Sequence, residues 1–392
     1  MKSWDRDIEL TTVVVTGIGM MTAIANDREN TWNQLLQGKS GITIDQQLQI
    51  PVARIDEIEN SQCNAQSSRA QYFLQKAVLE AIADANLELP LINCGVVIGS
   101  SRSNQRELEL LLDHPDRQLM QDNWWNCQPA NLSASIARLL QTQAPVLAPM
   151  AACATGNWAI AQACDLIRSG KCEMAIAGAT DAAITPLTIA GFQKIGVLAE
   201  LGVYPLSKER QGFALGEGAA SLVLESLQSA KQRATRIYGS VLGWGITNDA
   251  YHATSPSPDN LMAALAIKDC LTRSQITSEQ VGYINVHGTA TQMNDAREAE
   301  LIQNILPSSK VSGTKGATGH TLGATGMIEA AFCLLALRDQ VLPPCVGMQT
   351  PAFDIHTIQK AERSPDLQYA LNFSFGFGGQ NAIVAFGQEC KT

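Results

Sequence analysis

The sequence predicts an α/β protein with two similar halves. Two observations support this fold class: short apolar runs rich in β-branched residues alternate with segments of helical periodicity, and the same kinds of segment recur in similar order later in the chain. A third is composition, since 392 residues that are 45% hydrophobic and 17% charged can bury a large core. We expect one half over residues 1–235 and the other over residues 236–392.

The first half contains three strand-like runs and one clear early helix. "TTVVVTGIG" predicts a buried strand, "ENTWNQLLQG" a helix that ends near Gly38, "CGVVIGS" a second strand and "EMAIAGA" a third. The second half repeats this style. "SVLGWGI" and "GYINVHG" predict strands, "NDAREAELIQNIL" predicts a helix, and "QYALNFS" and "NAIVAFG" predict a closing pair of strands.

Composition and charge narrow the function classes. The formal net charge is −9, from 28 Lys and Arg against 37 Asp and Glu, which argues against nucleic-acid binding. The first residues lack the apolar stretch of a signal peptide, and we expect no membrane span and a cytoplasmic location. The ten cysteines are scattered without a metal-ligand spacing, so we expect them to be reduced and to bind no metal.

One cysteine stands out by its position. In "APMAACATGNWAIAQAC", apolar residues at helical spacing follow Cys153, and Gly170 offers a C-terminal stop. Cys153 therefore lies at or just before a helix N-terminus, where the helix dipole favours the thiolate and small neighbours let a substrate approach. This is the pattern of a nucleophile. The alternative is a small cysteine packed in the core.

Two of the five histidines lie in stretches rich in glycine and threonine. His287 occurs in "NVHGTATQMND" and His320 in "SGTKGATGHTLGATG", each near an expected strand end. Loops at such places carry chemistry on a rigid scaffold. Either histidine alone could be structural or exposed to solvent. Together with Cys153 they favour a catalytic site.

The chain resembles a known family over nearly its whole length. The stretches "VVVTGIGMMTAIANDRENTWNQLLQGKSGI", "AACATG", "GWGITNDAYHATSP", "NVHGTATQMND", "GTKGATGHTLGATGMIEA" and "NFSFGFGGQNAIVAF" resemble the successive motifs of the β-ketoacyl-acyl carrier protein synthases, in the right order. The most similar branch is that of the elongating Cys-His-His condensing enzymes. The resemblance implies the thiolase fold: two similar βαβαβ-type halves in a five-layered α-β-α-β-α arrangement, usually assembled as a dimer.

The resemblance also assigns roles to the candidate residues. Cys153 matches the nucleophile that holds the acyl group as a thioester. His287 and His320 match the pair of neutral imidazoles that stabilise the enolate formed when malonyl thioester loses carbon dioxide. Lys315 and Glu329 match a buried pair that orients the histidines.

Further residues match the family's acyl-transfer and binding groups. The backbone N–H groups of Cys153 and Phe377 would form an oxyanion hole, and the Phe377 ring would gate the acyl pocket. On the residues alone, the glycines around Phe377 also fit a hairpin turn. Thr289 and Thr291 match the hydroxyls that bind the phosphopantetheine arm. Thr254 and Ser255 are two further candidates for the wall of the channel through which this arm enters.

The implied activity is decarboxylative Claisen condensation of an acyl thioester with malonyl-acyl carrier protein in fatty acid, polyketide or polyene synthesis. The implied partners are an acyl carrier protein and a second subunit, identical or related. The carrier protein brings the phosphopantetheine, so the resemblance implies no cofactor held by the enzyme itself. Gln292 and Met293 depart from the usual proline and small residue and indicate a specialised branch. Two alternatives remain possible. One is a thiolase, although "GFGGQN" lacks the second cysteine of a thiolase, and the other is a non-catalytic partner subunit.

Overall fold

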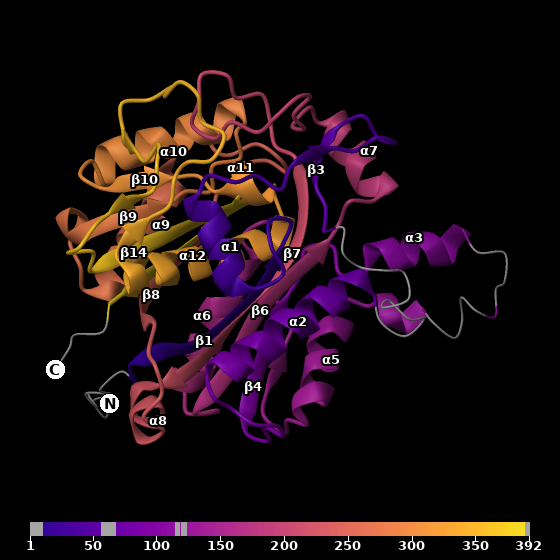
Figure 1. The fold of residues 1–392 in the computed structure, drawn as a ribbon, viewed down its shortest axis with the longest axis vertical. Helices are drawn as coiled ribbons and strands as arrows, with labels where there is room; N and C mark the ends of the chain where they lie inside the picture. The colour runs from indigo at the N-terminus through magenta and orange to yellow at the C-terminus, as the bar shows by residue number, and fades with distance from the viewer. Residues whose placement is uncertain (1–10, 56–67, 114–117, 119–123, 389–392) are drawn as a thin grey trace, which may run out of the picture.

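A computed structural model describes residues 11–55, 68–113, 118 and 124–388 (Figure 1). One long mixed sheet runs through it in the order β12-β10-β9-β14-β15-β8-β1-β7-β6-β4-β5, with β2 and β3 attached at β7. The bounds of its strands are β1 (Val13–Thr22), β2 (Thr43–Ile44), β3 (Pro51–Ala53), β4 (Cys94–Gly99), β5 (Val146–Leu147), β6 (Met174–Ala182), β7 (Leu215–Ser226), β8 (Gly239–Asn248), β9 (Val281–Asn285), β10 (Lys310–Ser312), β12 (His356–Thr357), β14 (Tyr369–Gly376) and β15 (Gln380–Gly387). A small separate pair consists of β11 (Val341–Leu342) and β13 (Glu362–Arg363).

The two parts of the sheet have the same topology. The order β5-β4-β6-β7-β1 in the first part corresponds to β10-β9-β14-β15-β8 in the second, with parallel and antiparallel pairings in the same sequence. An antiparallel pairing of β1 with β8, which includes Val13 opposite Val241, joins them. The predicted α/β fold with two similar halves is confirmed, and each apolar run predicted as a strand forms one.

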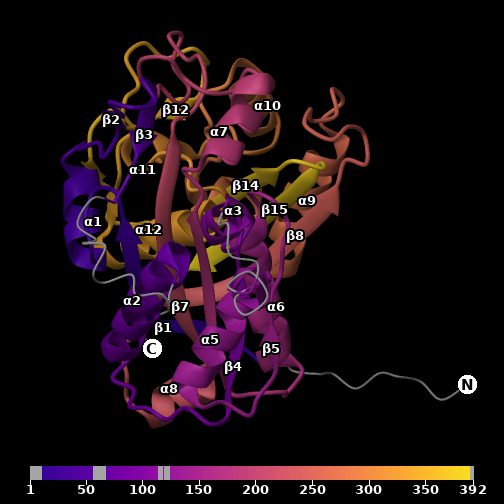
Figure 2. The ribbon, with the colours of Figure 1, turned by 90° about the vertical axis from the view of Figure 1, so that its right-hand side faces the viewer.

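Helices form three layers around these two parts of the sheet (Figures 1 and 2). Helices α6 and α12 pack against strands of both parts, α2 and α5 cover the outer face of the first part, and α9 and α10 cover that of the second. The helix bounds are α1 (Arg28–Leu36), α2 (Arg69–Asp84), α3 (Gln105–Asp113), α5 (Asn131–Leu140), α6 (Thr155–Arg168), α7 (Pro186–Lys194), α8 (Leu227–Gln232), α9 (Leu261–Ser274), α10 (Gln292–Ile305), α11 (Lys315–Thr318) and α12 (Thr325–Asp339), with 3₁₀ turns η1 (Trp124–Cys127), η2 (Ser278–Gln280) and η3 (Leu322–Ala324). This is the predicted five-layered arrangement.

The central layer depends on two unusually apolar helices. Every residue of α12 from Thr325 to Leu337 is buried, which requires a helix that is apolar on all sides. Helix α6 comes so close to it that a Cβ at Gly156 would lie 2.3 Å from the backbone nitrogen of Met327. Glycine is therefore required at this contact. Glu329 is the one charged residue in the buried part of α12, and it faces the site described below.

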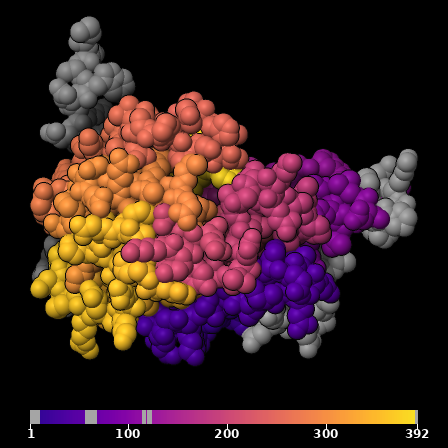
Figure 3. All heavy atoms as spheres, turned by 90° about the horizontal axis from the view of Figure 1, so that it is seen from above, coloured from indigo at the N-terminus to yellow at the C-terminus, as the bar shows by residue number. Residues whose placement is uncertain are grey.

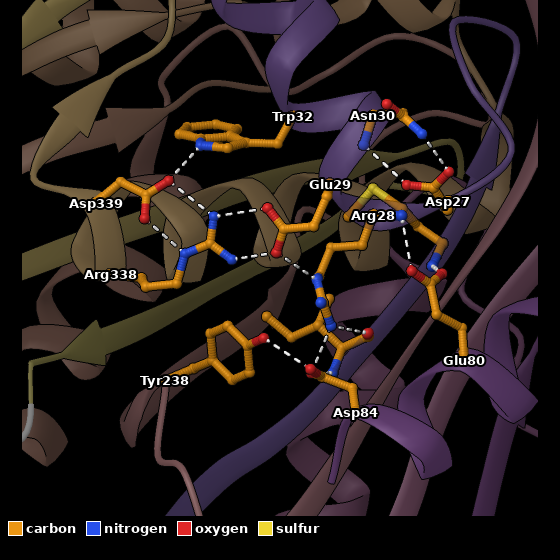
Figure 4. Close-up of polar contacts among 12 residues, drawn as sticks. Asp27, Arg28, Glu29, Asn30, Trp32, Glu80, Asp84, Tyr238, Arg338 and Asp339 are labelled. Atoms are coloured by element: carbon orange, nitrogen blue, oxygen red, sulfur yellow. Dashed lines mark hydrogen bonds and ion pairs between the residues drawn. The ribbon is translucent and has the colours of Figure 1, made fainter.

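A network of ion pairs fastens α1 to both halves of the molecule (Figure 4). We call Arg28, Glu29, Asp84, Arg338 and Asp339 the junction cluster. Arg338, near the end of α12, contacts Glu29 and Asp339, and Arg28 lies 2.6 Å from Asp84 on α2. The cluster connects residues that are more than 300 positions apart in the chain.

Within the described ranges, every helix is too short or too polar to cross a lipid bilayer.

Candidate active site

A pocket of about 200 Å³ opens where loops from both halves meet. Four segments form most of its lining: the end of α7 with the residues after it, residues 254–256, residues 287–297 and residues 375–379. Figure 3 shows it as a hollow between these segments, with the yellow C-terminal segment at its bottom. Cys153, His287 and His320 all line this pocket, so the structure brings the three predicted catalytic side chains together.

Cys153 lies in a tight turn directly before α6. Ala152 has a left-handed backbone with φ of +48°, an uncommon conformation for a residue with a Cβ. The hydroxyl of Thr155 holds the turn, because it accepts from the N–H of Ala151 at 2.8 Å and donates to the carbonyl of Ala152 at 2.6 Å. The turn places the Cys153 side chain at the N-terminal end of α6, as the sequence predicted, with 8% of the residue exposed.

The glycine-rich turn between β14 and β15 lies against Cys153. The backbone N–H of Phe377 is directed at the Cys153 sulfur, and the hydroxyl of Ser374 donates to the Cys153 carbonyl at 2.9 Å. A Cβ at Gly376 would lie 3.0 Å from the Cys153 nitrogen, so only glycine leaves this N–H open. The two segments of the predicted oxyanion hole are therefore adjacent. The turn is also a hairpin, so both interpretations of "GFGG" fit the structure.

Burial acts against the expected thiolate form of Cys153. Burial raises the pKa of the thiol to about 12, although the charges of Lys315 and Arg102 and the N–H of Phe377 act in the opposite direction. The sequence prediction considered the helix N-terminus and left out burial, which disfavours the charged thiolate. The raised pKa favours the neutral thiol while no substrate is bound.

His320 has a defined tautomer. The backbone N–H of Leu322 donates to its Nδ1 at 3.1 Å, so Nδ1 is an acceptor and a neutral ring carries its hydrogen on Nε2. The ring lies 4.8 Å from that of Phe213 and 5.2 Å from that of His287, centroid to centroid, and the two imidazoles are nearly perpendicular at 83°. His320 therefore has an N–H group free to donate on the side away from Leu322.

Both imidazoles are neutral. Burial lowers the pKa of His287 and of His320 well below 6.5, and the nearby charge of Lys315 lowers both further. The Nδ1 atom of His287 has no hydrogen-bond partner among the described residues, although it is buried. Two uncharged rings with free hydrogen-bonding capacity on one pocket suit the stabilisation of negative charge on a bound ligand.

Lys315 and Glu329 form a buried ion pair behind the histidines. The Lys315 Nζ lies 2.7 Å from the Glu329 Oε1 and also donates to the backbone carbonyl of His287. Burial raises the pKa of Glu329 to about 7, although Lys315 opposes this. The pair holds the backbone of His287, which is the orienting position that the resemblance implied.

Two carboxylates that the sequence analysis missed support the same loop. Both oxygens of Glu298 accept 2.6 Å hydrogen bonds, one from the N–H of His287 and one from that of Gly288. Asp295 accepts from the N–H of Ala290 at 3.1 Å. Burial is the main cause that raises the pKa of Glu298 to about 8. The sequence contained a signal for both, since Asp295 and Glu298 are three residues apart near the start of α10 and therefore share one face of this helix.

The predicted binding residues also line the pocket. The hydroxyls of Thr289 and Thr291 lie 2.9 Å apart on the 287–297 side. Thr254 and Ser255 lie on the facing loop, where both backbone N–H groups donate to the Nδ1 of His252 at 3.1 Å. All four residues therefore border the route to Cys153.

Comparisons with known proteins agree with this geometry. The family described as Beta-ketoacyl synthase, N-terminal domain matches residues 11–67 and 52–230, and the one described as Beta-ketoacyl synthase, C-terminal domain matches residues 238–349. A 3-oxoacyl-[acyl-carrier-protein] synthase 2 of Staphylococcus aureus is 33% identical over 95% of this chain and 97% of its own length. The enzyme of the same name from Synechocystis is 34% identical over 97% and 99%.

Solved structures show the same similarity. The ishigamide ketosynthase/chain length factor aligns with a TM-score of 0.90 at 28% identity, covering 96% of this chain and 99% of that one. A type II PKS acyl-carrier protein in complex with its ketosynthase bound to the hexaketide gives a TM-score of 0.90 at 27% identity, covering 97% and 100%. The strand order, the pocket and these matches agree: the chain belongs to the β-ketoacyl synthase family.

Proposed function

We propose that this protein is a 3-oxoacyl-[acyl-carrier-protein] synthase. It would join an acyl group held on Cys153 to a two-carbon unit from malonyl-acyl carrier protein, with loss of carbon dioxide. The observation that carries the proposal is the placement of Cys153, His287 and His320 on one pocket. Three reaction steps follow from this geometry.

The first step loads the enzyme. The Cys153 sulfur attacks the carbonyl of the incoming acyl thioester, the bond to the carrier's sulfur breaks, and the thiol proton leaves with that sulfur. The negative charge on the tetrahedral oxygen is stabilised by the N–H groups of Cys153 and Phe377. Because the resting thiol is neutral, loading includes a proton transfer, which occurs only when substrate is present.

The second step generates the carbon nucleophile. The bond between the malonyl carboxylate and its α-carbon breaks, carbon dioxide leaves, and the electron pair is delocalised onto the thioester oxygen. The Nε2–H of His320 and the neutral ring of His287 stabilise this enolate oxygen. Lys315 and Glu329 contribute by holding the His287 backbone.

The third step forms the carbon–carbon bond. The α-carbon attacks the acyl carbonyl on Cys153, the tetrahedral intermediate collapses, and the carbon–sulfur bond to Cys153 breaks. The sulfur takes up a proton and returns to the neutral thiol that burial favours. The product is a 3-oxoacyl chain on the carrier protein.

The proposal extends to partners and pathway. An acyl carrier protein would bring both substrates on phosphopantetheine, whose arm passes Thr289 and Thr291, and the enzyme itself would hold no cofactor. Strand β5 lies at one end of the strand order with Val146 40% exposed, which suits pairing with a second subunit, identical or related. We place the protein in fatty acid or polyketide synthesis and in the cytoplasm.

Separate assays of the half-reactions test the proposal. His287→Ala and His320→Ala should nearly abolish carbon dioxide release from malonyl carrier protein, while acyl loading of Cys153, followed by intact mass, should survive at least in part. Cys153→Ala should show no loading and residual decarboxylation. The two kinds of variant act on different transition states, so their defects should differ.

The proposal fails if His320→Ala loads normally and also condenses at the wild-type rate. It also fails if the wild-type protein takes up no acyl group from any carrier thioester.

A further inference from the structure

Arg102 lies directly behind the apolar side of the pocket. Its guanidinium carbon is 5.5 Å from the centroid of the Phe192 ring, and Phe192 lines the pocket together with Cys153. The backbone of Arg102 is fixed, because its N–H donates to the buried Asp181 at 2.9 Å, and Asp181 also accepts from Ser100 and Ser101. The fold therefore fixes the backbone from which this side chain extends, shortly after β4 ends at Gly99.

The guanidinium of Arg102 has no ionic partner within the part of the chain that the structure describes. Among residues 11–55, 68–113, 118 and 124–388, no carboxylate forms an ion pair with its guanidinium and no group accepts a hydrogen bond from its side chain. The side chain is exposed, yet its charge is felt at the Cys153 thiol, where it lowers the pKa. A free guanidinium near an apolar pocket is available to a ligand that enters from the Cys153 side.

The pocket has a polar side and an apolar side, which sets the direction of an acyl chain. Thr254, Thr289 and Thr291 border the polar side, where a carrier's arm would enter. On the other side Cys153 belongs to a cluster of buried apolar residues that includes Phe192 and Phe213. A chain bound to Cys153 gains most by extending into this cluster, because apolar surface leaves water there.

Phe192 is the residue of this apolar cluster against which Arg102 packs. Its ring centroid lies 6.0 Å from that of Phe377 and 5.4 Å from that of Phe213, and Arg102 contacts the same ring. A chain too long for the space between these aromatic rings must displace Phe192, and its far end then meets the guanidinium.

We propose that Arg102 determines acyl specificity by favouring chains whose far end carries a carboxylate over chains of the same length that end in a methyl group. The inference rests on the proposed function, since it concerns the group held on Cys153. A carboxylate can accept two parallel hydrogen bonds from the guanidinium fork. A methyl group in the same place removes water from the guanidinium and returns no hydrogen bond, which is unfavourable.

The test compares loading rates of two acyl carrier thioesters of equal chain length, one ending in a carboxylate and one in a methyl group, with acylation of Cys153 followed by intact mass. The wild-type protein should load the carboxylate-ended chain faster, on the order of tenfold. Arg102→Leu should reverse this preference and Arg102→Lys should keep part of it. Arg106→Leu, at the start of α3, is the matched control and should leave the preference unchanged.

The outcomes are distinguishable. Equal loading ratios in the wild type and in Arg102→Leu would overturn the role of Arg102, and so would faster loading of the methyl-ended chain by the wild type. A wild-type protein that accepts neither chain on Cys153 would instead contradict the proposed function.

Discussion

Helix α12 takes part in two clusters of charged residues that differ in how completely they are paired. At its C-terminal end, Arg338 and Asp339 belong to the junction cluster, where every oxygen of Glu29, Asp84 and Asp339 has a hydrogen-bond or ion-pair partner. Earlier in the same helix, Glu329 pairs with Lys315 but leaves its Oε2 without a partner among the described residues. The Nδ1 of His287 nearby is also unpartnered.

The pKa values differ in the same way. Although burial alone would raise the pKa of Glu29 and Asp339, contacts with Arg338 hold both below their usual range. Burial dominates at Glu329, whose pKa rises to about 7. A fully paired cluster stabilises one conformation of the protein. A cluster with unsatisfied buried atoms is costly, and it is retained where a substrate or a reaction step uses those atoms.

The largest expected effect comes from removing one cation from each cluster. Lys315→Met leaves Glu329 buried without its partner and releases the His287 carbonyl, so decarboxylation should fall on the order of a hundredfold and stability by about 3 kcal/mol. Arg338→Met should cost about 1 kcal/mol and leave activity unchanged. Denaturant unfolding and a carbon dioxide release assay measure the two quantities.

A double variant separates charge burial from positioning. Lys315→Met combined with Glu329→Leu removes the uncompensated carboxylate, so stability should return to within about 1 kcal/mol of the wild type. Activity should stay low, because nothing then holds the His287 carbonyl. Recovery of decarboxylation in this double variant would show that Lys315 acts only through Glu329.

The second prediction concerns the effect of burial on Cys153. With a pKa of about 12, the thiolate fraction and the rate of alkylation by iodoacetamide should rise by about tenfold for each pH unit between about pH 7 and pH 10. Peptide mapping by mass spectrometry separates Cys153 from the other cysteines. A rate that levels off near neutral pH would mean that a thiolate is present at rest, as the helix N-terminus alone predicted.

Local patterns in the sequence were sufficient for much of the fold and of the site. Apolar runs predicted the strands, because a buried strand in a mixed sheet is recognisable without its neighbours. The position of Cys153 before α6 followed from helical periodicity and a glycine stop. The glycine-rich loops of His287 and His320 were identified by composition and by resemblance, and the structure brings them to one pocket.

Properties that depend on packing between distant segments were not predictable in this way. The pKa of Cys153 depends on its burial and on groups distant in the chain, among them Lys315 and the N–H of Phe377, and no local pattern contains these contacts. Arg102 approaches Phe192 across 90 positions of sequence. The junction cluster joins Glu29 to Arg338, which are 309 positions apart, and no local pattern links these two segments. Such contacts follow from topology, which one sequence does not specify.

The smallest expected effect is the coupling between Arg338 and Glu29, and it distinguishes the two clusters by their response to solvent. Their side chains are 21% and 46% exposed, so a double-mutant cycle with Arg338→Met and Glu29→Gln should give about 0.5 to 1 kcal/mol. This coupling should decrease in high salt, because exposed charges are screened. It should also vanish as the pH falls below the usual range of a glutamate, since the lowered pKa of Glu29 means that its contribution exists only while it is ionised.

The Lys315–Glu329 pair is buried and should show no such salt dependence in the same measurement. If both pairs responded equally to salt, burial would not be what separates the Lys315–Glu329 pair from the junction cluster.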